Sequence, residues 1–547
     1  MPHQRSTDRE RQTVRSFLMG MSAADREHTP AQMLERLLDK APQPGAALAW
    51  ALARDPDATV REFASALLLV AAHDPAVSRR VRRPILRAAG TVLERALHDP
   101  EVDDEVKFRI GPALSLCGIE VDDAAYRSAF RDHAGTSRRM MEEAFRGKET
   151  TPEAVDAWLE TMELPDPASF AIALDLCRAA VEVNAPLGAM LLVCLAARSL
   201  ESGIEGERAE MLRLAASTHS GEARWALRTF GELPSTGALG DLARALAVEL
   251  QAAAIEESVP RTGPFEHGLV SMVDGAGSRQ VALFFRGPEA DGDRDALMLL
   301  PNDEVGIKDV FGVWAEGDEV LERFDAFASV AAVAPCDLAL ARALTADALA
   351  THARTGRPVP AGFLCLRPLL GPEPLLPLAR EPDLSAYGLE RLRVGPELVA
   401  RSGNLAYRPD TQSLYCATDR AYQFVADRIR RSGEDDGLLA LSRRELRRFL
   451  EEIAAEDGPR LLHRLAVNLE VQALAGRAKE TGNKRLARLW WGLRHEVVPF
   501  ADVPFVEELT RNGLGAIVEN VLQGFLTQAE ANEAELEASR LDEDGNP

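Results

Sequence analysis

Residues 51–71, ALARDPDATVREFASALLLVA, decide how this 547-residue chain is interpreted. Asp55 and Pro56 stand where a helix can start, because an Asp side chain caps free backbone N–H groups and a Pro at the first helical position needs none. The apolar residues that follow recur at i, i+3, i+4, i+7 and i+8: Val60, Phe63, Ala64, Leu67 and Leu68. The stretch therefore predicts an amphipathic helix that starts at Asp-Pro.

A second segment of the same kind begins at Asp99-Pro100, 44 residues after Asp55-Pro56. Its apolar residues also recur at helical spacing: Val106, Ile110, Ala113, Leu114 and Cys117. Val60-Arg61 in the first segment corresponds to Val106-Lys107 in the second. Arg61 and Lys107 are therefore expected at equivalent positions of an interaction surface. Residues 221–231 have a similar rhythm of small and apolar side chains.

These segments resemble HEAT-like α-solenoids, in which two-helix units of about 40–47 residues stack on one another. Residues 51–71 carry the resemblance best, and it covers about a third of the chain. Pro112 falls inside the second segment, where a proline is expected to kink the helix. Between residues 120 and 220 the period is not recognisable. The resemblance implies a binding surface and not a reaction.

After residue 257 the pattern changes from helical to strand-like. Pro260 and Pro264 interrupt the helices, and short runs rich in Val, Phe and Leu follow between turn residues: GLVSMV, RQVALFFR, DALMLLP and VFGVWAEG. These runs predict a small antiparallel sheet. The helical pattern returns at about residues 337–355, and residues 356–412 are rich in Pro and Gly.

The predicted fold is therefore mostly α, with a HEAT-like helical repeat array, a small antiparallel β module and a C-terminal helical block. Asp74-Pro75 and Asp166-Pro167 are expected to start further helices. The expected segments are a flexible N-terminal arm (1–28), the array (29–257), the β-rich module (258–335), a helix with a Pro-rich connector (336–412), the C-terminal helical domain (413–530) and an acidic disordered tail (531–547).

Residues 272–286, MVDGAGSRQVALFFR, admit two interpretations: a glycine loop that holds a phosphate, or a tight turn between strands. A phosphate loop leads into a helix and requires a further Gly or a Gly-Lys-Ser/Thr sequence. Here Gln280 stands where the third Gly of a dinucleotide loop belongs, and a strand-like run follows. Asp274, Gly275 and Gly277 supply turn residues instead. The stretch predicts a β-hairpin.

Composition narrows the classes of function. Lys and Arg number 63 and Asp and Glu 86, and the resulting net charge of −23 repels phosphate backbones, so a nucleic-acid partner is not expected. The six cysteines include no C-x-x-C pair, which favours buried thiols in a reducing compartment over a zinc site. Without an apolar signal core or a run long enough to span a bilayer, we expect a cytoplasmic protein that makes no membrane contact.

No catalytic, cofactor-binding or metal-ligating residues are predicted. The sequence lacks H-E-x-x-H, G-x-S-x-G and S-x-x-K. Asp291, Asp293 and Asp295 imitate the start of a calcium loop, but the required Gly and Glu are absent further on, so a solvated hairpin loop is expected. His73 and His98 each precede an Asp-Pro and are expected to be turn residues, not ligands.

Residues 477–495, RAKETGNKRLARLWWGLRH, hold six Lys or Arg and one Glu in a chain that is otherwise acidic. Arg477, Lys484, Arg485 and Arg488 are candidates for a cationic face, with Trp491 as a stacking residue. The competing interpretation is an ordinary amphipathic helix, because Leu486, Leu489, Trp490 and Leu493 form a stripe at i, i+3, i+4 and i+7. The pattern favours the amphipathic helix.

The function that this sequence favours is a non-enzymatic interaction or scaffold protein, which docks another protein on its helical-repeat surface. This is inferred from the repeat resemblance and from the lack of catalytic motifs. Two alternatives stay open. One is an enzyme with a site between the β module and the C-terminal helical block. The other is a nucleic-acid-associated protein that uses the basic helix 477–495.

Overall fold

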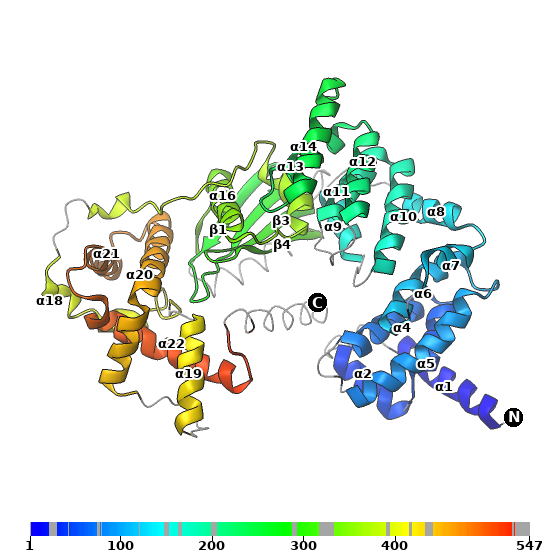
Figure 1. Cartoon of the computed structure of the whole chain (residues 1–547), viewed down its shortest axis with the longest axis horizontal. Coiled ribbons are helices and arrows are strands. Elements are labelled where there is room, and N and C mark those ends of the chain that lie inside the picture. Colours follow the sequence, from blue (N-terminus) through cyan, green and yellow to red (C-terminus); the bar gives the residue numbers. More distant parts are fainter. Residues whose placement is uncertain are drawn as a thin grey trace.

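Figure 1 shows the computed structural model of the chain, an arch with helices at both ends and a sheet between them. The structure describes all residues except 1, 21–29, 42, 74–76, 78, 120, 147–151, 162–166, 198–204, 287–292, 317–332, 390–393, 415–417, 433–440, 528–529 and 531–547. The fold is mostly α with one antiparallel sheet of five strands, as predicted. No helix among the described residues is both long and apolar enough to traverse a bilayer.

The N-terminal half of the arch is an array of helices that we call the helical array. Near its start, α3 packs on α5 while α4 packs on α6. Near its end, α11 packs on α13 while α12 packs on α14, so both regions are built of stacked helix pairs. The helices are α1 (Pro2–Met19), α2 (Pro30–Lys40), α3 (Gly45–Arg54), α4 (Ala58–His73), α5 (Arg79–Leu97), α6 (Asp104–Leu116), α7 (Asp123–Ser128), α8 (His133–Ala144), α9 (Pro152–Thr161), α10 (Pro167–Val183), α11 (Ala185–Ala197), α12 (Glu205–Ser217), α13 (Gly221–Glu232) and α14 (Gly237–Ala252).

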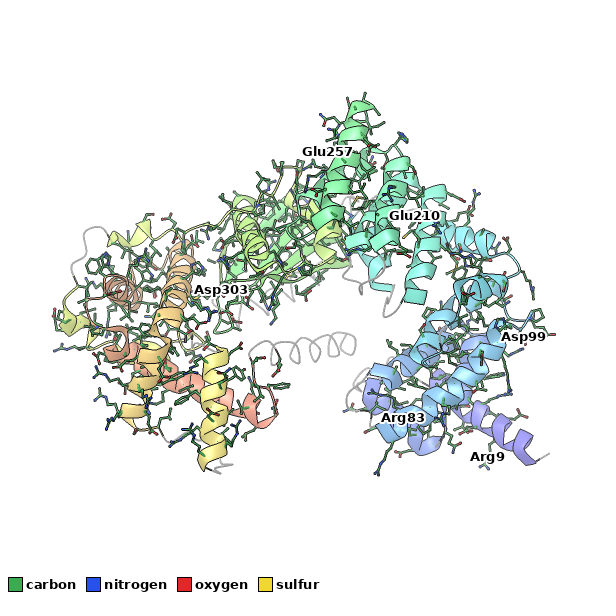
Figure 2. All side chains as sticks on the ribbon, in the orientation of Figure 1. Arg9, Arg83, Asp99, Glu210, Glu257 and Asp303 are labelled. Carbon is green, nitrogen blue, oxygen red and sulfur yellow. The ribbon has the colours of Figure 1, made fainter. Side chains whose placement is uncertain are left out.

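Ion pairs join segments that are separate in the sequence on the surface of the helical array. Each pair links an arginine to a carboxylate 29 to 48 residues away in the sequence. Figure 2 labels Asp99, Glu210 and Glu257, which take part in them, along the array. Exposed pairs of this kind contribute little stability each, so the apolar core holds the stack and the pairs mainly fix its register. They are Arg54–Asp99, Arg109–Glu62, Arg127–Asp175, Arg178–Glu210 and Arg228–Glu257.

The start of the chain differs from the flexible arm that was predicted. Residues Pro2–Met19 form helix α1, which packs against α3 and α4. Val14, Phe17 and Leu18 are buried at i, i+3 and i+4, so a short apolar stripe holds a helix that is otherwise strongly charged.

The Asp-Pro dipeptides do not cap the helices that follow them in the two repeat segments. Helix α4 begins at Ala58, and Asp57, not Asp55, accepts the backbone N–H of Thr59 at 2.9 Å. Helix α6 begins at Asp104, while Asp99 caps the turn before it by accepting the N–H of Glu101 at 2.9 Å. Asp-Pro therefore closes the preceding turn, and the two helices start two and four residues after the prolines that were predicted to begin them.

Two other Asp-Pro predictions have different outcomes. Helix α10 begins at Pro167, which agrees with a proline at the first helical position, although Asp166 lies outside the described residues. Asp74-Pro75 also lies outside them. Pro112 lies inside α6, and the helix continues through it to Leu116.

The sheet has the strand order β4-β3-β2-β1-β5, and all neighbouring strands are antiparallel. Its strands are β1 (Phe265–Ser271), β2 (Val281–Arg286), β3 (Asp293–Asn302), β4 (Gly306–Glu316) and β5 (Val333–Pro335). Side chains alternate along β2: Val281, Leu283 and Phe285 belong to the main core, whereas Ala282 and Phe284 form a small cluster on the opposite face. Helix α16 (Leu338–Thr355) packs on β4 and β3, as Figure 1 shows.

The segment after α16 returns to the helical array. This Pro-rich connector holds short helical turns: α17 (Gly362–Leu366), η2 (Arg367–Leu370), η3 (Ser385–Tyr387), α18 (Pro396–Val399) and η5 (Gly403–Tyr407). Helix α17 packs against α9, α11, α13 and β4 at once. Phe363, Leu364 and Cys365 are fully buried there. The array, the sheet and α16 thus share one continuous hydrophobic core.

The C-terminal helical block has its own core. It consists of α19 (Asp419–Ser432), α20 (Arg443–Leu474), α21 (Thr481–Arg494), η6 (Phe500–Asp502) and α22 (Pro504–Leu522). Helix α20 begins with a capping box in which Ser442 and Glu445 satisfy each other's backbone N–H groups. Its buried residues include an unusual number of polar side chains near its C-terminal end, and these reach the sheet.

Candidate functional site

The two array residues predicted for an interaction surface have structural roles. Lys107 is only 1 % exposed, and its ammonium donates to the carbonyl oxygen of Ala129 at 2.6 Å and lies 3.5 Å from a carboxylate oxygen of Asp104. Lys107 is therefore no surface residue, which corrects that prediction. Arg61 is half-buried and donates to the carbonyl oxygen of Asp55 at 2.7 Å, so it holds the turn before its own helix.

The basic segment 477–495 forms α21 with the core stripe that the competing interpretation required. Leu486, Leu489 and Leu493 are buried. The indole N–H of Trp490 donates to the carbonyl oxygen of Leu462 at 2.9 Å. Helix α21 begins at Thr481, so Arg477 precedes it; Arg477, Lys484 and Arg488 are exposed. Arg485 is half-buried and donates to Asn404. Trp491 packs against the core of the C-terminal block and stacks on His495 with 3.9 Å between ring centroids.

The glycine stretch 272–280 is the turn of a hairpin between β1 and β2, as predicted. Gly277 has a φ of +82°, and the Asp274 carboxylate accepts the N–H of Ser278 at 2.8 Å. A Cβ at position 277 would overlap a carboxylate oxygen of Asp303 and contact Arg464. Only glycine fits there, because the conformation is left-handed and another segment lies against the turn.

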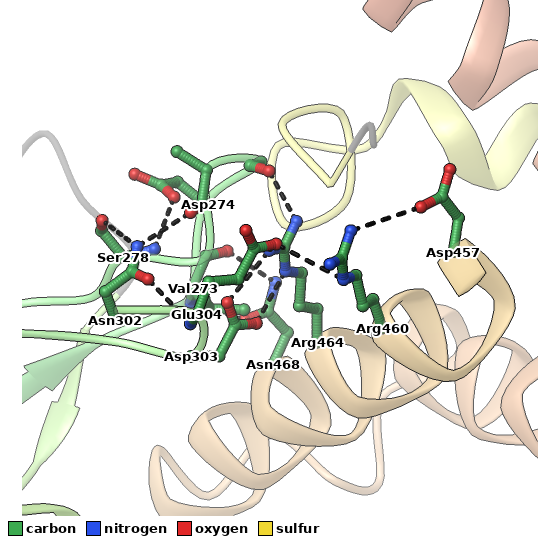
Figure 3. Close-up of polar contacts among 12 residues, drawn as sticks. Val273, Asp274, Ser278, Asn302, Asp303, Glu304, Asp457, Arg460, Arg464 and Asn468 are labelled. Atoms are coloured by element: carbon green, nitrogen blue, oxygen red, sulfur yellow. Dashed lines mark hydrogen bonds and ion pairs between the residues drawn. The ribbon is translucent and has the colours of Figure 1, made fainter. Parts of the chain in front are cut away.

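That other segment is α20, whose Arg464 reaches the turns of two hairpins. Arg464 is 3 % exposed. Its guanidinium donates to both carboxylate oxygens of Asp303 at 2.8 and 3.0 Å, to Glu304 at 2.9 Å and to the carbonyl oxygen of Gly275 at 2.6 Å, as Figure 3 shows. Arg464 thus uses its fork of donors to join the β1–β2 turn to the β3–β4 turn.

Asn468 and Gln472 continue this contact at intervals of four residues, so we call Arg464, Asn468 and Gln472 the α20 polar stripe. The Asn468 amide accepts the N–H of Val273 at 2.8 Å and donates to the carbonyl oxygen of Asp410 at 3.0 Å. The Gln472 amide N–H lies 3.4 Å from a carboxylate oxygen of Asp410. One face of α20 therefore binds the sheet and the connector through buried hydrogen bonds, a contact that requires matched partners.

A cleft of about 810 Å³ opens beside the α20 polar stripe, and we call it the junction cleft. Its walls come from the hairpin turns, α16, the connector and α20. A volume of this size is typical of sites for small molecules. The lining residues are Val273, Gly277, Arg279, Pro301, Asn302, Asp303, Glu304, Val305, Leu344, Asp347, Ala348, Thr351, Arg354, Thr355, Arg357, Ala379, Arg380, Glu381, Pro459, Arg460, His463 and Val467.

The lining of the junction cleft is rich in charged side chains, with a small excess of arginine over carboxylate. Its lining holds five arginines and four carboxylates. Arg380 pairs with both carboxylate oxygens of Glu470, and Arg460 lies 3.6 Å from Glu304. Arg279 is buried, and burial together with the charge of Arg380 lowers the pKa of its guanidinium. The unpaired Arg279 suits an acidic ligand, and the lining residues that the structure describes include no nucleophile that a neighbouring base activates.

Other candidate sites give no reactive arrangement. Within the described ranges, no group of three or more His, Cys, Asp or Glu is placed to hold a metal ion. Asp295 is buried within β3, so the predicted solvated loop is wrong at that position, while Asp291 lies outside the described residues. The side chain of His73 also lies outside them, and His98 is exposed.

The described cysteines are free thiols, and most of them are buried. Burial raises the pKa of the Cys117 thiol to about 11 and that of Cys336 to about 12. Cys365 contacts a carboxylate oxygen of Asp156 at 3.4 Å, and its pKa is raised by Cys194 and by burial. These thiols are therefore protonated and inert at neutral pH. Cys416 lies outside the described residues.

Sequence reasoning missed both the α20 polar stripe and Arg279. The stripe had a visible signal, because Arg464, Asn468 and Gln472 interrupt an apolar helix at regular intervals of four. No signal in the sequence pointed to Arg279, because a basic residue beside a hairpin turn is ordinarily solvated.

Comparisons with known proteins add nothing to this geometry. No protein-family model, no curated protein and no solved structure matches the chain.

Proposed function

We propose that this chain is a non-enzymatic interaction protein that holds another protein on the helical array, which we interpret as a HEAT-like solenoid. The stacked pairs α3–α4 with α5–α6, and α11–α12 with α13–α14, support the proposal. Such stacks present an extended surface made of many helices. The free thiols fit a reducing compartment, so we place the protein in the cytoplasm.

The observation that carries the proposal is a cationic strip on α5. Arg80, Arg83 and Arg87 are exposed at i, i+3 and i+7, so they lie on one helix face, and Figure 2 labels Arg83 there. Many other arginines of the array pair with a carboxylate of a neighbouring helix. These three make no ion pair with any residue in the described part of the chain. In a chain of net charge −23, such a strip fits an acidic protein surface.

The test is co-purification of the full-length chain from the cells that produce it, followed by mass spectrometry. The test variant is Arg83→Glu with Arg87→Glu. The matched control is Lys484→Glu with Arg488→Glu, which reverses two exposed cations at the same spacing on α21. We expect one stoichiometric protein with the wild type and the control, and its loss from the α5 variant. Retention by the α5 variant, or no bound protein at all, contradicts the proposal.

The enzyme alternative is favoured by the position of the junction cleft, between the β module and the C-terminal block. Against it, the lining hydroxyls are engaged in their own helix: Thr351 contacts the carbonyl oxygen of Asp347 at 3.4 Å, and Thr355 donates to that of Thr351 at 2.9 Å. Turnover of one member of a metabolite panel, lost on substitution of a lining residue, would decide for an enzyme.

The nucleic-acid alternative depends on the exposed Lys484 and Arg488 of α21. It requires a nuclease-sensitive excess of absorbance at 260 nm in the purified wild type. The Lys484→Glu with Arg488→Glu variant would then lose that excess, and binding would weaken steeply with salt. The same co-purification therefore separates this alternative from the protein-docking proposal.

A further inference from the structure

Arg279 is the arginine at the junction of the sheet and α20 that combines burial with a side chain that has no partner among the described residues. It is 8 % exposed and lines the junction cleft. Its backbone N–H donates to the carbonyl oxygen of Pro301 at 3.0 Å, which fixes the main chain. Its guanidinium makes no hydrogen bond or ion pair with any residue that the structure describes. A guanidinium that is largely withdrawn from bulk water and has no acceptor in the protein is costly.

The carboxylates nearest to this guanidinium are held by other donors. Asp303 binds both sides of the Arg464 fork at 2.8 and 3.0 Å. Glu470 pairs with Arg380 and also accepts the N–H of Asp383 at 2.8 Å. The carboxylate of Asp347 accepts the backbone N–H of Arg380 at 3.2 Å. The negative charges of these three acids make the electrostatic potential around Arg279 more negative, but none of the three forms a hydrogen bond with it.

We propose that the junction cleft binds a small organic anion, a carboxylate or a phosphate ester, whose charged end pairs with Arg279. The geometry supplies what such a ligand needs. Arginine presents two parallel N–H groups that match two oxygens of a carboxylate or phosphate. The burial of Arg279 strengthens that pair, because the local dielectric is lower than that of water. This inference is independent of the protein-docking proposal.

The remaining lining limits the size and chemistry of the anion. Arg354 and Arg357 are exposed, and they provide a second positive region for the approach or for a second acidic group. Apolar side chains form much of the rest of the wall: Val273, Val305, Leu344, Ala348, Ala379 and Val467. Among the lining residues that the structure describes, His463 carries the one aromatic ring, so the wall gives little stacking surface for a nucleobase. An aliphatic or sugar-like acid fits best.

The probes are inorganic phosphate, citrate and succinate, each titrated into the full-length chain by calorimetry and by thermal unfolding. The test variant is Arg279→Met, which keeps an unbranched apolar stem and removes the charged guanidinium. The matched control is Arg401→Met, at an exposed arginine outside the cleft. We expect at least one probe to bind the wild type and the control. Arg279→Met should lose at least tenfold in affinity, together with the ligand-induced rise in Tm.

The ligand-free Tm separates a binding role from a structural one. If Arg279 serves a ligand, its removal relieves a buried unpaired cation, so Arg279→Met melts at or above the wild-type temperature without a probe. If Arg279→Met melts lower and still binds the probes, the arginine is structural and the proposal is wrong. Failure of all three probes to bind at millimolar concentration also overturns it.

The probes and a second variant decide the remaining cases. Binding of citrate or succinate without phosphate assigns a carboxylate ligand, and the reverse assigns a phosphate, and both support the site. Should Arg279→Met fail to fold, Arg279→Lys keeps the charge but cannot form a bidentate pair. A folded Arg279→Lys protein that binds at least threefold more weakly supports the proposal, and one that binds equally well overturns it.

Discussion

Replacement of Asp457 by Asn should stabilise the C-terminal block at neutral pH. Asp457 lies in α20, is 1 % exposed, and neither of its carboxylate oxygens has a hydrogen-bond partner among the described residues. Arg460 stands 3.6 Å away, one turn along the helix, as Figure 3 shows. Burial raises the pKa of this carboxyl from the ordinary 3.8 to about 6. Ionisation of Asp457 therefore destabilises the folded state.

The sign of the effect follows from proton binding. Between pH 4 and pH 6 the folded chain keeps a proton on Asp457 that the unfolded chain has released, so stability falls as the pH rises through this window. The loss is half complete for the folded state at its pKa of about 6 and is complete about one pH unit higher. The difference between 3.8 and about 6 corresponds to about 3 kcal/mol at about 1.4 kcal/mol per pH unit. Because the amide of Asn is also buried without a partner, we expect a net gain of about 1–2 kcal/mol at pH 7.5.

The assay is urea unfolding of the full-length chain at pH 4.5 and at pH 7.5, followed by hydrogen exchange of peptides from α20. Exchange resolves the C-terminal block from the helical array, which a single optical signal would not do. The gain should be present at pH 7.5 and nearly absent at pH 4.5. Equal effects at both pH values, or a loss of stability at pH 7.5, would refute the reasoning that the Asp457 charge is destabilising.

Three further substitutions test other contacts. Gly45→Ala should lower the free energy of unfolding by about 1–3 kcal/mol, because the new Cβ overlaps the carbonyl oxygen of Ile85 in α5. The control is Gly206→Ala, which has open space around it and should be neutral or slightly stabilising. Chemical unfolding measures both. Arg464→Met should cost about 3 kcal/mol and speed hydrogen exchange of residues 272–280; unchanged exchange would contradict the role given to the α20 polar stripe. Burial lowers the pKa of His352, which accepts the N–H of Ile307 at 2.8 Å while neutral. Protonation of His352 should therefore cost stability as the pH falls below 6.5, opposite in sign to the contribution of Asp457. Relative to the wild type, His352→Gln should lack that loss when unfolding is compared at pH 7.5 and 5.5.

The elements that local pattern decides were predictable from the sequence. The four apolar runs after residue 264 are β1 to β4, and the turn at Gly277 is where Asp274 and the glycines indicated it. The three-residue β5 was missed, because it exists only through its pairing with β1, about 65 residues earlier. Helix α1 was missed because its many charges hid the stripe of Val14, Phe17 and Leu18.

The candidate site was not predictable, for a different reason. Arg464 and its partners Asp303 and Gly275 are 161 and 189 residues apart in the chain, so no local spacing relates them. Lys107 and Arg61 were chosen by their positions in two similar segments, but similarity of position does not tell whether a long side chain is exposed. That the Arg279 guanidinium has no acceptor in the described part of the protein becomes visible only when its neighbours are placed in three dimensions.

The packing of α17 against α9, α11 and α13 has a consequence for how the protein is made. When a ribosome has synthesised the helical array, the residues that complete its core, Phe363 to Cys365 among them, are still about 100 residues away. The apolar surface of the nascent array that α17 covers therefore stays exposed until α17 has been synthesised and packs on it. Fragments that end near residue 257 should therefore aggregate, and those that extend past Leu370 should stay in solution.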